Sequence, residues 1–355
     1  MSECATGSAS ASFALEFDRK HWQSQWHTLQ WDDLSLLQLF MTRNTALSPV
    51  IICNLLISLW LVARSLKRLR QTTLPTAAWC AITGLMLAVV AQSIELIDPA
   101  QSTGWVDLGW YFAAVVLLCP GIAVLGARRP GASAWAFFVL LPLVLVLMWP
   151  AVASFQVARP ADSIEIEVPA LVGFGLVLVM SGGNYFGTRY TMPTFYYAAA
   201  IVLLVVPMSV AAPDFFPERS MARFMASLGF LLAIGEASSR SNAAPNDEIS
   251  RFDVLWFDFM DSFGMVWAKR VMDRVNESAR HEKWAMHLEL HGFVPIAEPP
   301  SADELLRTDE RIEHTFRWLM KRFVDPEWID ARLQEPTAGQ APSDEVQHPP
   351  ATEER

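Results

Sequence analysis

The sequence predicts a mostly α-helical fold, in which a polytopic membrane bundle of about seven spanning helices precedes a small α+β domain in the cytoplasm. Composition is the first reason. Of the 355 residues, 52% are hydrophobic and only 18% are charged, whereas soluble domains carry roughly a quarter of charged residues. Distribution is the second reason, because the apolar residues gather in runs near the roughly 20 residues that a spanning helix needs.

The runs divide the chain into four expected parts, which are an extracytoplasmic N-terminal tail at 1–47, a transmembrane domain at 48–240, a cytoplasmic α+β domain at 247–335 and a disordered tail at 336–355. A cleavable signal peptide is not expected, because Met1–Ser12 has neither a basic start nor an apolar core. The aromatic and charged stretch Phe17–Phe40 predicts either an interfacial helix or an ordered cap on the outer face.

Seven apolar stretches are expected to span the membrane as helices, since backbone groups cannot be left unsatisfied in hydrocarbon. They cover Pro49–Ala63 with an upstream extension at Thr45–Ser48, Thr76–Ile97, Trp105–Leu125, Ala132–Phe155, Val168–Tyr185, Pro193–Ala212 and Ala222–Ala237. The last stretch has the poorest span signal, because it is short and contains Arg223, Ser227 and Glu236.

Lysine and arginine in the short connections predict the orientation, since they stay on the cytoplasmic side. Basic connections follow the first, third and fifth stretches and contain Arg64, Lys67, Arg68, Arg70, Arg128, Arg129 and Arg189. The alternate connections are acidic or mixed and contain Glu95, Asp98, Asp107, Arg159, Asp162, Glu165, Glu167, Asp214, Glu218, Arg219 and Arg223. With an odd number of spans, the N-terminus is expected outside and the C-terminal domain in the cytoplasm of a multi-pass protein of the cell membrane, plasma or inner.

After a polar linker at Ser238–Asn246, the hydrophobic period becomes that of a surface helix. Its apolar residues recur at three- and four-residue intervals, and they are Phe252, Leu255, Trp256, Phe259, Phe263, Val266 and Trp267. The charged residues Asp253, Asp258, Asp261 and Lys269 fall largely on other positions. One amphipathic helix is therefore predicted up to about Arg280.

A hairpin and two further helices are predicted after it. Trp284–Leu290 alternates apolar and polar residues, and Gly292 can turn the chain back through Phe293–Ile296. Ser301 and Glu304 have the spacing of a capping box, which opens a helix with Leu305, Ile312, Phe316, Leu319 and Phe323. Asp325 and Pro326 suit the start of a short helix that buries Trp328, Ile329 and Leu333. The two long helices are expected to pack on each other, because the hairpin is too small to cover either.

The sequence contains no HExxH, GxSxG or Walker motif. The four cysteines form no CxxC pair or zinc spacing, and all seven histidines lie outside the predicted spans, which excludes a transmembrane haem held by two histidines. These absences disfavour an enzyme without excluding one, and no cofactor is expected. A formal net charge of -10 disfavours nucleic acid as a partner.

One cluster has the composition of a metal site. His287, Glu289 and His291 are spaced by two residues on the predicted strand, which would place them on one face. Two imidazoles and a carboxylate can bind zinc or iron. A solvated strand face explains the same pattern and is preferred, because no second cluster completes a ligand set.

Polar residues in or beside the predicted spans are candidates for binding a solute, and they are Asn54, Gln92, Asn184, Tyr185 and Arg189. Each can equally hydrogen-bond a neighbouring helix, while Glu95 and Glu236 lie close enough to an interface to be hydrated. The segment Ser181–Arg189 contains three glycines beside polar and cationic side chains. Such a segment can hold a phosphate or a lipid headgroup, although a tight cytoplasmic turn is the preferred interpretation.

Two function classes remain open. In the first, the bundle anchors a cytoplasmic module that binds a protein partner or self-associates, which the tryptophan-rich C-terminal segment favours. In the second, the bundle is a transporter or a receptor-like binder of a small or lipid-like solute, and the C-terminal module regulates it. In both, the lipid bilayer is the first expected partner.

Overall fold

The computed structural model describes residues 46–98, 103–130, 132–157, 165–240, 250–284, 286–295 and 302–333. The predicted interfacial helix at Phe17–Phe40, the tail at 336–355, most of the linker and the proposed cap residue Ser301 lie outside the described residues.

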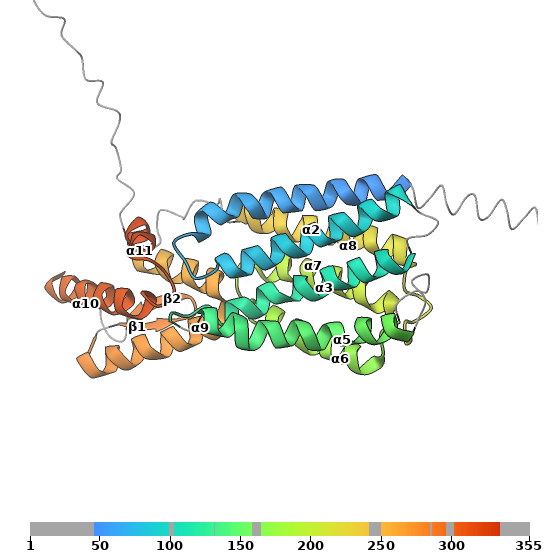
Figure 1. Cartoon of the computed structure of the whole chain (residues 1–355). Coiled ribbons are helices and arrows are strands. Elements are labelled where there is room, and N and C mark those ends of the chain that lie inside the picture. The colour runs from blue at the N-terminus through green and yellow to red at the C-terminus, as the bar shows by residue number, and fades with distance from the viewer. Residues whose placement is uncertain are drawn as a thin grey trace, which may run out of the picture.

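Helices dominate the described chain, so the predicted helical class is confirmed. Up to residue 240, they are Ala46–Leu69, α2 (Pro75–Ile97), α3 (Thr103–Leu125), α4 (Ala132–Trp135), α5 (Leu141–Val157), α6 (Val168–Gly183), α7 (Thr191–Val205) and α8 (Arg219–Arg240). A π-helical turn, η1 (Ala136–Leu140), joins α4 to α5, and a 3-10 turn, η2 (Val206–Met208), extends α7. These helices lie side by side as one bundle, with the C-terminal elements at one end (Figure 1).

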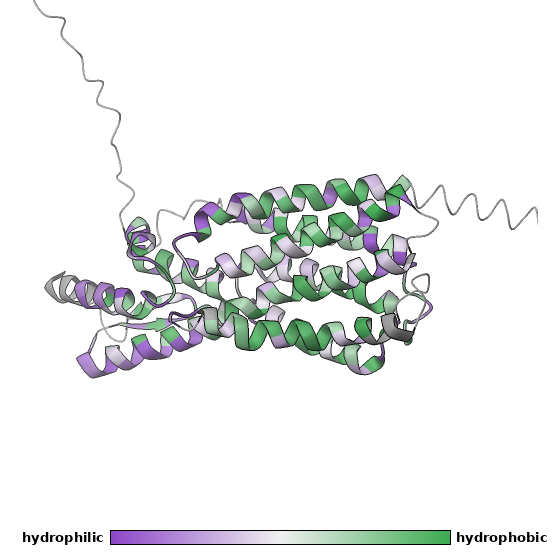
Figure 2. Ribbon diagram, viewed as in Figure 1, coloured by the Kyte–Doolittle hydropathy of each residue, from purple (hydrophilic) through white to green (hydrophobic). Residues whose placement is uncertain are grey.

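Five of the described helices are long and apolar enough to cross a membrane, which supports a membrane protein. They are Ala46–Leu69, Pro75–Ile97, Gly104–Leu125, Thr191–Met208 and Arg219–Arg240. The apolar helices Ala136–Val152 and Val168–Gly183 are shorter. Figure 2 shows hydrophobic residues over most of the bundle and hydrophilic residues concentrated in the C-terminal elements and at the bundle ends.

The stretch with the poorest span signal is among these five helices, because α8 extends beyond Ala222–Ala237 at both ends. Arg219 was assigned to an outer connection, and Arg223 both to that connection and to the last stretch; the structure places Arg219 at the start of α8 and Arg223 within it. Both pair with carboxylates of other helices, so their charges are compatible with a helix that packs into the bundle.

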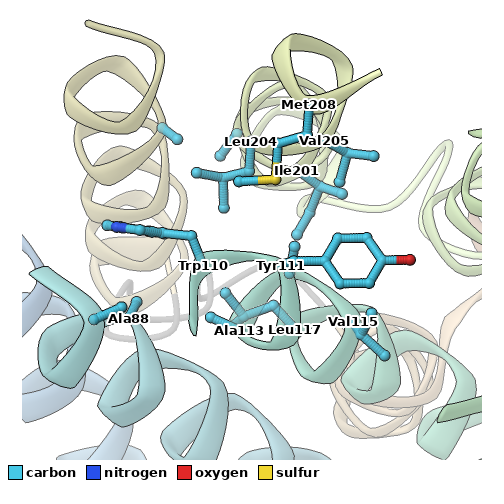
Figure 3. Close-up of a cluster of buried hydrophobic side chains, with 14 of the residues drawn as sticks. Ala88, Trp110, Tyr111, Ala113, Val115, Leu117, Ile201, Leu204, Val205 and Met208 are labelled. Atoms are coloured by element: carbon cyan, nitrogen blue, oxygen red, sulfur yellow. The ribbon is translucent and has the colours of Figure 1, made fainter. Parts of the chain in front are cut away.

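The helix α3 lies at the centre of the bundle, and two thirds of its apolar window is buried, at 67%. It is hydrophobic on all sides, as a helix surrounded by others is expected to be. Trp110 and Tyr111 point to opposite sides of it, and the α7 residues Ile201 and Leu204 lie against the same cluster (Figure 3). On α2, a Cβ atom at Gly84 would lie 2.6 Å from Leu117 Cγ, so the absence of a side chain lets α2 and α3 pack closely.

The C-terminal module comprises residues 250–333. It contains α9 (Arg251–Glu282), β1 (Met286–Glu289), β2 (Gly292–Pro295), α10 (Ala302–Met320) and α11 (Pro326–Leu333). The hairpin is confirmed, with Leu288 opposite Phe293 in an antiparallel register. Its first strand is shorter than predicted, because Lys283 adopts a left-handed conformation that ends α9 and leaves Trp284 before the strand. Phe323 follows α10 in a turn instead of lying within the helix.

The predicted amphipathic helix is interrupted. Gly264 has φ 77° and ψ 176°, which is not helical, so α9 consists of two helical segments. Val266, directly after the break and expected on the apolar face, is 41% exposed. Asp261, before the break and expected on the polar face, is 5% exposed, because it pairs with Arg189 of another connection.

The two long helices of the module pack on each other, as predicted. Phe252 of α9 lies 6.4 Å from Phe316 of α10 between ring centroids, and Phe259 lies 5.3 Å from Phe323. The same core also includes Leu74, Val124 and Ala127 of the bundle. The module and the end of the bundle therefore share one hydrophobic core.

Candidate functional site

The junction between the bundle and the C-terminal module contains the largest group of polar contacts that reach across the molecule. In the connection before α2, Thr73 N donates to Phe323 O and Gln71 O accepts from Asp325 N, both at 2.8 Å. In the connection after α3, Arg129 N donates to Arg322 O, also at 2.8 Å. These contacts use the backbone on both sides, so they fix the path of the chain regardless of side-chain rotamers.

A third connection, between α6 and α7, enters the break in α9 and forms what we call the clasp, comprising Asn184, Phe263, Gly264, Met265 and Val266. The Asn184 amide Nδ2 donates to Phe263 O at 3.1 Å, and its Oδ1 accepts from Val266 N at 2.9 Å. Its backbone O accepts from Met265 N at 2.7 Å. Asn184 thus supplies the partners that these backbone groups of α9 lose at the break.

The clasp requires glycine at position 264 for two reasons. The φ angle of Gly264 is 77°, in a region that residues with a side chain seldom adopt. In addition, a Cβ atom there would lie 2.6 Å from Asn184 O and would also meet the Asn184 side chain. The break and the asparagine are therefore matched to each other.

A charged cluster adjoins the clasp, formed by Arg189, Asp258, Asp261 and Arg332. The Arg189 side chain pairs with Asp261 and, at 2.5 Å, with Asp258. Its backbone N donates to Asp261 Oδ1 at 3.1 Å. Arg332 of α11 donates to the other Asp258 oxygen at 2.8 Å. Two cations and two carboxylates thus join the α6–α7 connection, α9 and α11.

Burial shapes the protonation of this junction cluster. It raises the pKa of Asp261 above its ordinary 3.8, although Arg189 opposes the shift. Burial likewise lowers the pKa of Arg332 below its ordinary value, with Asp258 opposing. A group can be charged here only because its partner is close.

A second charged cluster lies at the opposite end of the bundle and consists of Glu95, Asp107, Arg219 and Arg223, from α2, α3 and α8. Asp107 pairs with both arginines, and Arg223 donates to Glu95 Oε2 at 3.0 Å. Asp107 and Arg223 have side chains only 3% and 8% exposed. The Nε atom of Arg223 is buried and has no hydrogen-bond partner among the described residues. We call these four residues the bundle cluster.

Gln92 connects the bundle cluster to the core. Its Nε2 donates to Glu95 Oε2 at 3.0 Å and to Ser48 Oγ at 2.9 Å, and its Oε1 accepts from Trp110 Nε1 at 3.2 Å. Each of these hydrogen bonds joins polar atoms that would be costly to bury alone.

The predicted solute-binding residues are divided between these places. Asn184, Tyr185 and Arg189 come together against α9, where Tyr185 OH donates to Ser262 O at 3.5 Å. Gln92 lies beside the bundle cluster, and Asn54 donates to Ser227 Oγ at 3.2 Å between two helices. All five therefore have partners within the protein.

The predicted metal candidates are not arranged as a ligand set. His287 Nε2 lies 2.9 Å from Glu289 Oε1, so these two share a strand face as expected. His291 lies in the turn between the strands, because β1 already ends at Glu289. Over the ranges that the structure describes, no three His, Cys, Asp or Glu residues are placed to hold a metal ion.

An open cleft of about 510 Å³ lies between the second half of α9 and β1, lined by Asp273, Asn276, Glu277, Ala279, Arg280 and His287. Its two carboxylates pair with Lys269 and Arg274 on the same helix. Asn276 is used to hold β1, since it bonds both N and O of Leu288. The polar groups of the cleft thus serve the module's own structure.

Comparisons of the chain with protein-family models, with curated proteins and with solved structures give no match. The case for a function therefore depends on the geometry of the junction and of the bundle cluster. Inspection of the sequence did not single out Gly264 or the pairing of Asp107 with Arg219 and Arg223. A glycine inside a predicted amphipathic helix was the available signal for the first.

Proposed function

We propose that this protein is a multi-pass protein of the cell membrane, in which seven helices anchor a C-terminal module on the cytoplasmic side and hold it ready for a protein partner or for self-association. The seven spans are the five long apolar helices together with the helix from α4 to α5 and the short α6. The observation that carries the proposal is the junction, where three connections of the bundle bind the module through backbone atoms.

The distribution of charge supports this orientation. The connections that contact the module are those with Arg70, Arg128, Arg129 and Arg189, whereas the opposite end has Asp98, Glu165, Glu167, Asp214 and Glu218. An excess of arginine and lysine is characteristic of the cytoplasmic side.

Exposed aromatic residues support the same placement in a bilayer. Trp60 and Trp79 are exposed toward the basic end, and Trp105, Trp149 and Phe215 toward the acidic end. Such residues concentrate at the two membrane interfaces.

The junction also favours an anchor and scaffold over a loosely tethered domain. Because the module shares its hydrophobic core with the bundle, its outer surface keeps a fixed position relative to the membrane. A partner would then meet a preformed surface, without the entropic cost of ordering a flexible linker.

Topology is the direct test. Reporters fused after Leu74 and after Pro130 should be active in the cytoplasm, and reporters fused after Pro99 and after Asp214 should be active only when exported. A cytoplasmic signal after Pro99 would contradict the proposed order of spans.

The second candidate function is a binder of a small or lipid-like solute, favoured by the buried Arg223 Nε atom that has no partner among the described residues. A screen of small solutes by thermal unfolding of the purified protein distinguishes the solute binder from the scaffold. A solute that stabilises the protein, and fails to do so after Gln92→Ala, would support the binder. Site-specific photo-crosslinking from Glu327, exposed on α11, to one protein of defined mass would support the scaffold.

A further inference from the structure

The end of α10 presents an exposed aromatic ring between two cations. Trp318 is 51% exposed. Lys321 Nζ and Arg322 Cζ lie 5.9 Å and 5.7 Å from its ring centroid. Both basic side chains belong to exposed residues, so the ring and the two charges are available on the surface.

This group lies directly against the bundle. The backbone O of Arg322 accepts from Arg129 N, and the next residue, Phe323, accepts from Thr73 N. Arg128 and Arg129 are both exposed. Asp325 is the carboxylate nearest in the chain, and it pairs with Arg129 at 2.7 Å. Four exposed basic residues, Arg128, Arg129, Lys321 and Arg322, therefore gather where the module meets the bundle.

The same contacts also give the position of this group relative to the membrane. Residues 71–73 and 129 connect apolar helices, so they leave the hydrocarbon at the headgroup layer if those helices span it. Trp79, in the second turn of α2, is exposed at the same end. Trp60 is also exposed, and the Cζ atom of Arg64 lies 5.6 Å from its ring centroid. Trp60 and Trp318 are thus both exposed tryptophans with a basic side chain close to the ring.

We propose that Arg128, Arg129, Trp318, Lys321 and Arg322 form a binding patch for the phosphate of anionic phospholipid headgroups. The proposal rests on the proposed function, because it requires the bundle to lie in a membrane. The patch gives the C-terminal module a direct hold on the bilayer in addition to its contacts with the bundle.

The chemistry of the residues selects this ligand. Tryptophan is favoured at the headgroup layer, where its apolar ring and its N–H group are both accommodated. Lysine and arginine near an anionic surface each contribute roughly fivefold in binding. Guanidinium groups in addition match two phosphate oxygens at once. A neutral zwitterionic lipid offers the same phosphate with a compensating cation, so a preference for anionic lipid is expected.

The test uses the full-length protein in mixed detergent and lipid micelles with equal amounts of phosphatidylglycerol and phosphatidylcholine, and native mass spectrometry of the retained lipids. The wild type should retain phosphatidylglycerol preferentially. Lys321→Gln with Arg322→Gln should reduce that preference by about tenfold or more. Trp318→Ala should weaken retention of both lipids while the preference for the anionic one persists.

The matched control is Arg280→Gln with Lys283→Asn, which removes two exposed charges at the far end of α9; asparagine suits the left-handed backbone at 283. This variant should keep the wild-type preference. Equal preference in the Lys321 and Arg322 variant and in the wild type would overturn the proposal, as would full displacement of phosphatidylglycerol by inorganic phosphate, which would identify free phosphate as the ligand. Micelles impose no orientation, so failure of the topology test alone would leave this result unaffected.

Discussion

Two clusters of arginine and carboxylate residues lie at opposite ends of this molecule, and they differ in what surrounds them. The bundle cluster is enclosed by apolar helices, and Asp107 alone serves two arginines. The junction cluster lies between a connection and the module, and there Arg189 has two carboxylates while Asp258 has two arginines. In the first, the side chain of Arg223 is only 8% exposed, whereas in the second that of Arg189 is 36% exposed.

The difference that matters is the burial of the arginine. Removing one member of a buried pair is strongly destabilising, because the other charge stays buried. Where the arginine is partly exposed and solvent screens its charge, the loss is closer to that of a surface ion pair. Neutralising one aspartate at each end therefore separates the two situations.

The largest effect is expected for Asp107→Asn. The substitution removes the carboxylate that both arginines share, while the Arg223 charge stays buried at 8% exposure, and we expect a loss of roughly 3–5 kcal/mol in the free energy of unfolding. Thermal unfolding of the purified full-length protein would show it as a large fall in Tm. Asp214→Asn, at an exposed position of the same end, should leave Tm nearly unchanged. Similar Tm values for the two variants would show that the bundle cluster does not stabilise the fold.

A smaller effect, about 1 kcal/mol or less at neutral pH, is expected for Asp261→Asn. Arg189 keeps Asp258, and the asparagine oxygen can still accept from Arg189 N. The wild type should also show a pH dependence that the variant lacks. Since burial raises the pKa of Asp261 in the folded protein, the folded state holds this proton more tightly than the unfolded chain.

The stabilisation from that proton is complete below the ordinary pKa of 3.8 and is lost as the pH rises through the raised value. The wild type should therefore gain stability over Asp261→Asn on acidification within this window. Tm of both proteins from pH 7 down to pH 4 is the measurement. A constant difference between them would show that Asp261 keeps its ordinary pKa.

The sequence was informative where the signal was local. Apolar runs and turn residues depend on neighbours in the chain, and so the helices of the bundle and the hairpin closed by Gly292 were predicted at nearly the observed places. The break at Gly264 was not predicted, because the hydrophobic pattern of a helix continues across it. The break is acceptable only since Asn184, from another part of the chain, supplies hydrogen bonds.

The candidate site also shows that local sequence signals do not predict contacts between distant residues. Asn184, Tyr185 and Arg189 were singled out as candidates for binding a solute, and they do come together, but against α9. Arg219 and Arg223 were counted with an outer connection, and Arg223 also weakened the span signal of the last stretch, since charges are costly in an apolar helix. Their partners Asp107 and Glu95 remove that cost, and such pairing between distant residues is not visible in hydropathy.

The clasp joins the bundle and the C-terminal module as one structure, and hydrogen exchange at its amides tests this most directly. In the full-length protein in lipid nanodiscs, the Met265 and Val266 amides should exchange slowly, because both donate to Asn184 at 2.7 Å and 2.9 Å. In Asn184→Ala, exchange at Val266 should accelerate several-fold, whereas Val271 and Val275 further along α9 should stay protected. Rapid exchange at Met265 and Val266 in the wild type, or no change at Val266 in the variant, would contradict the account.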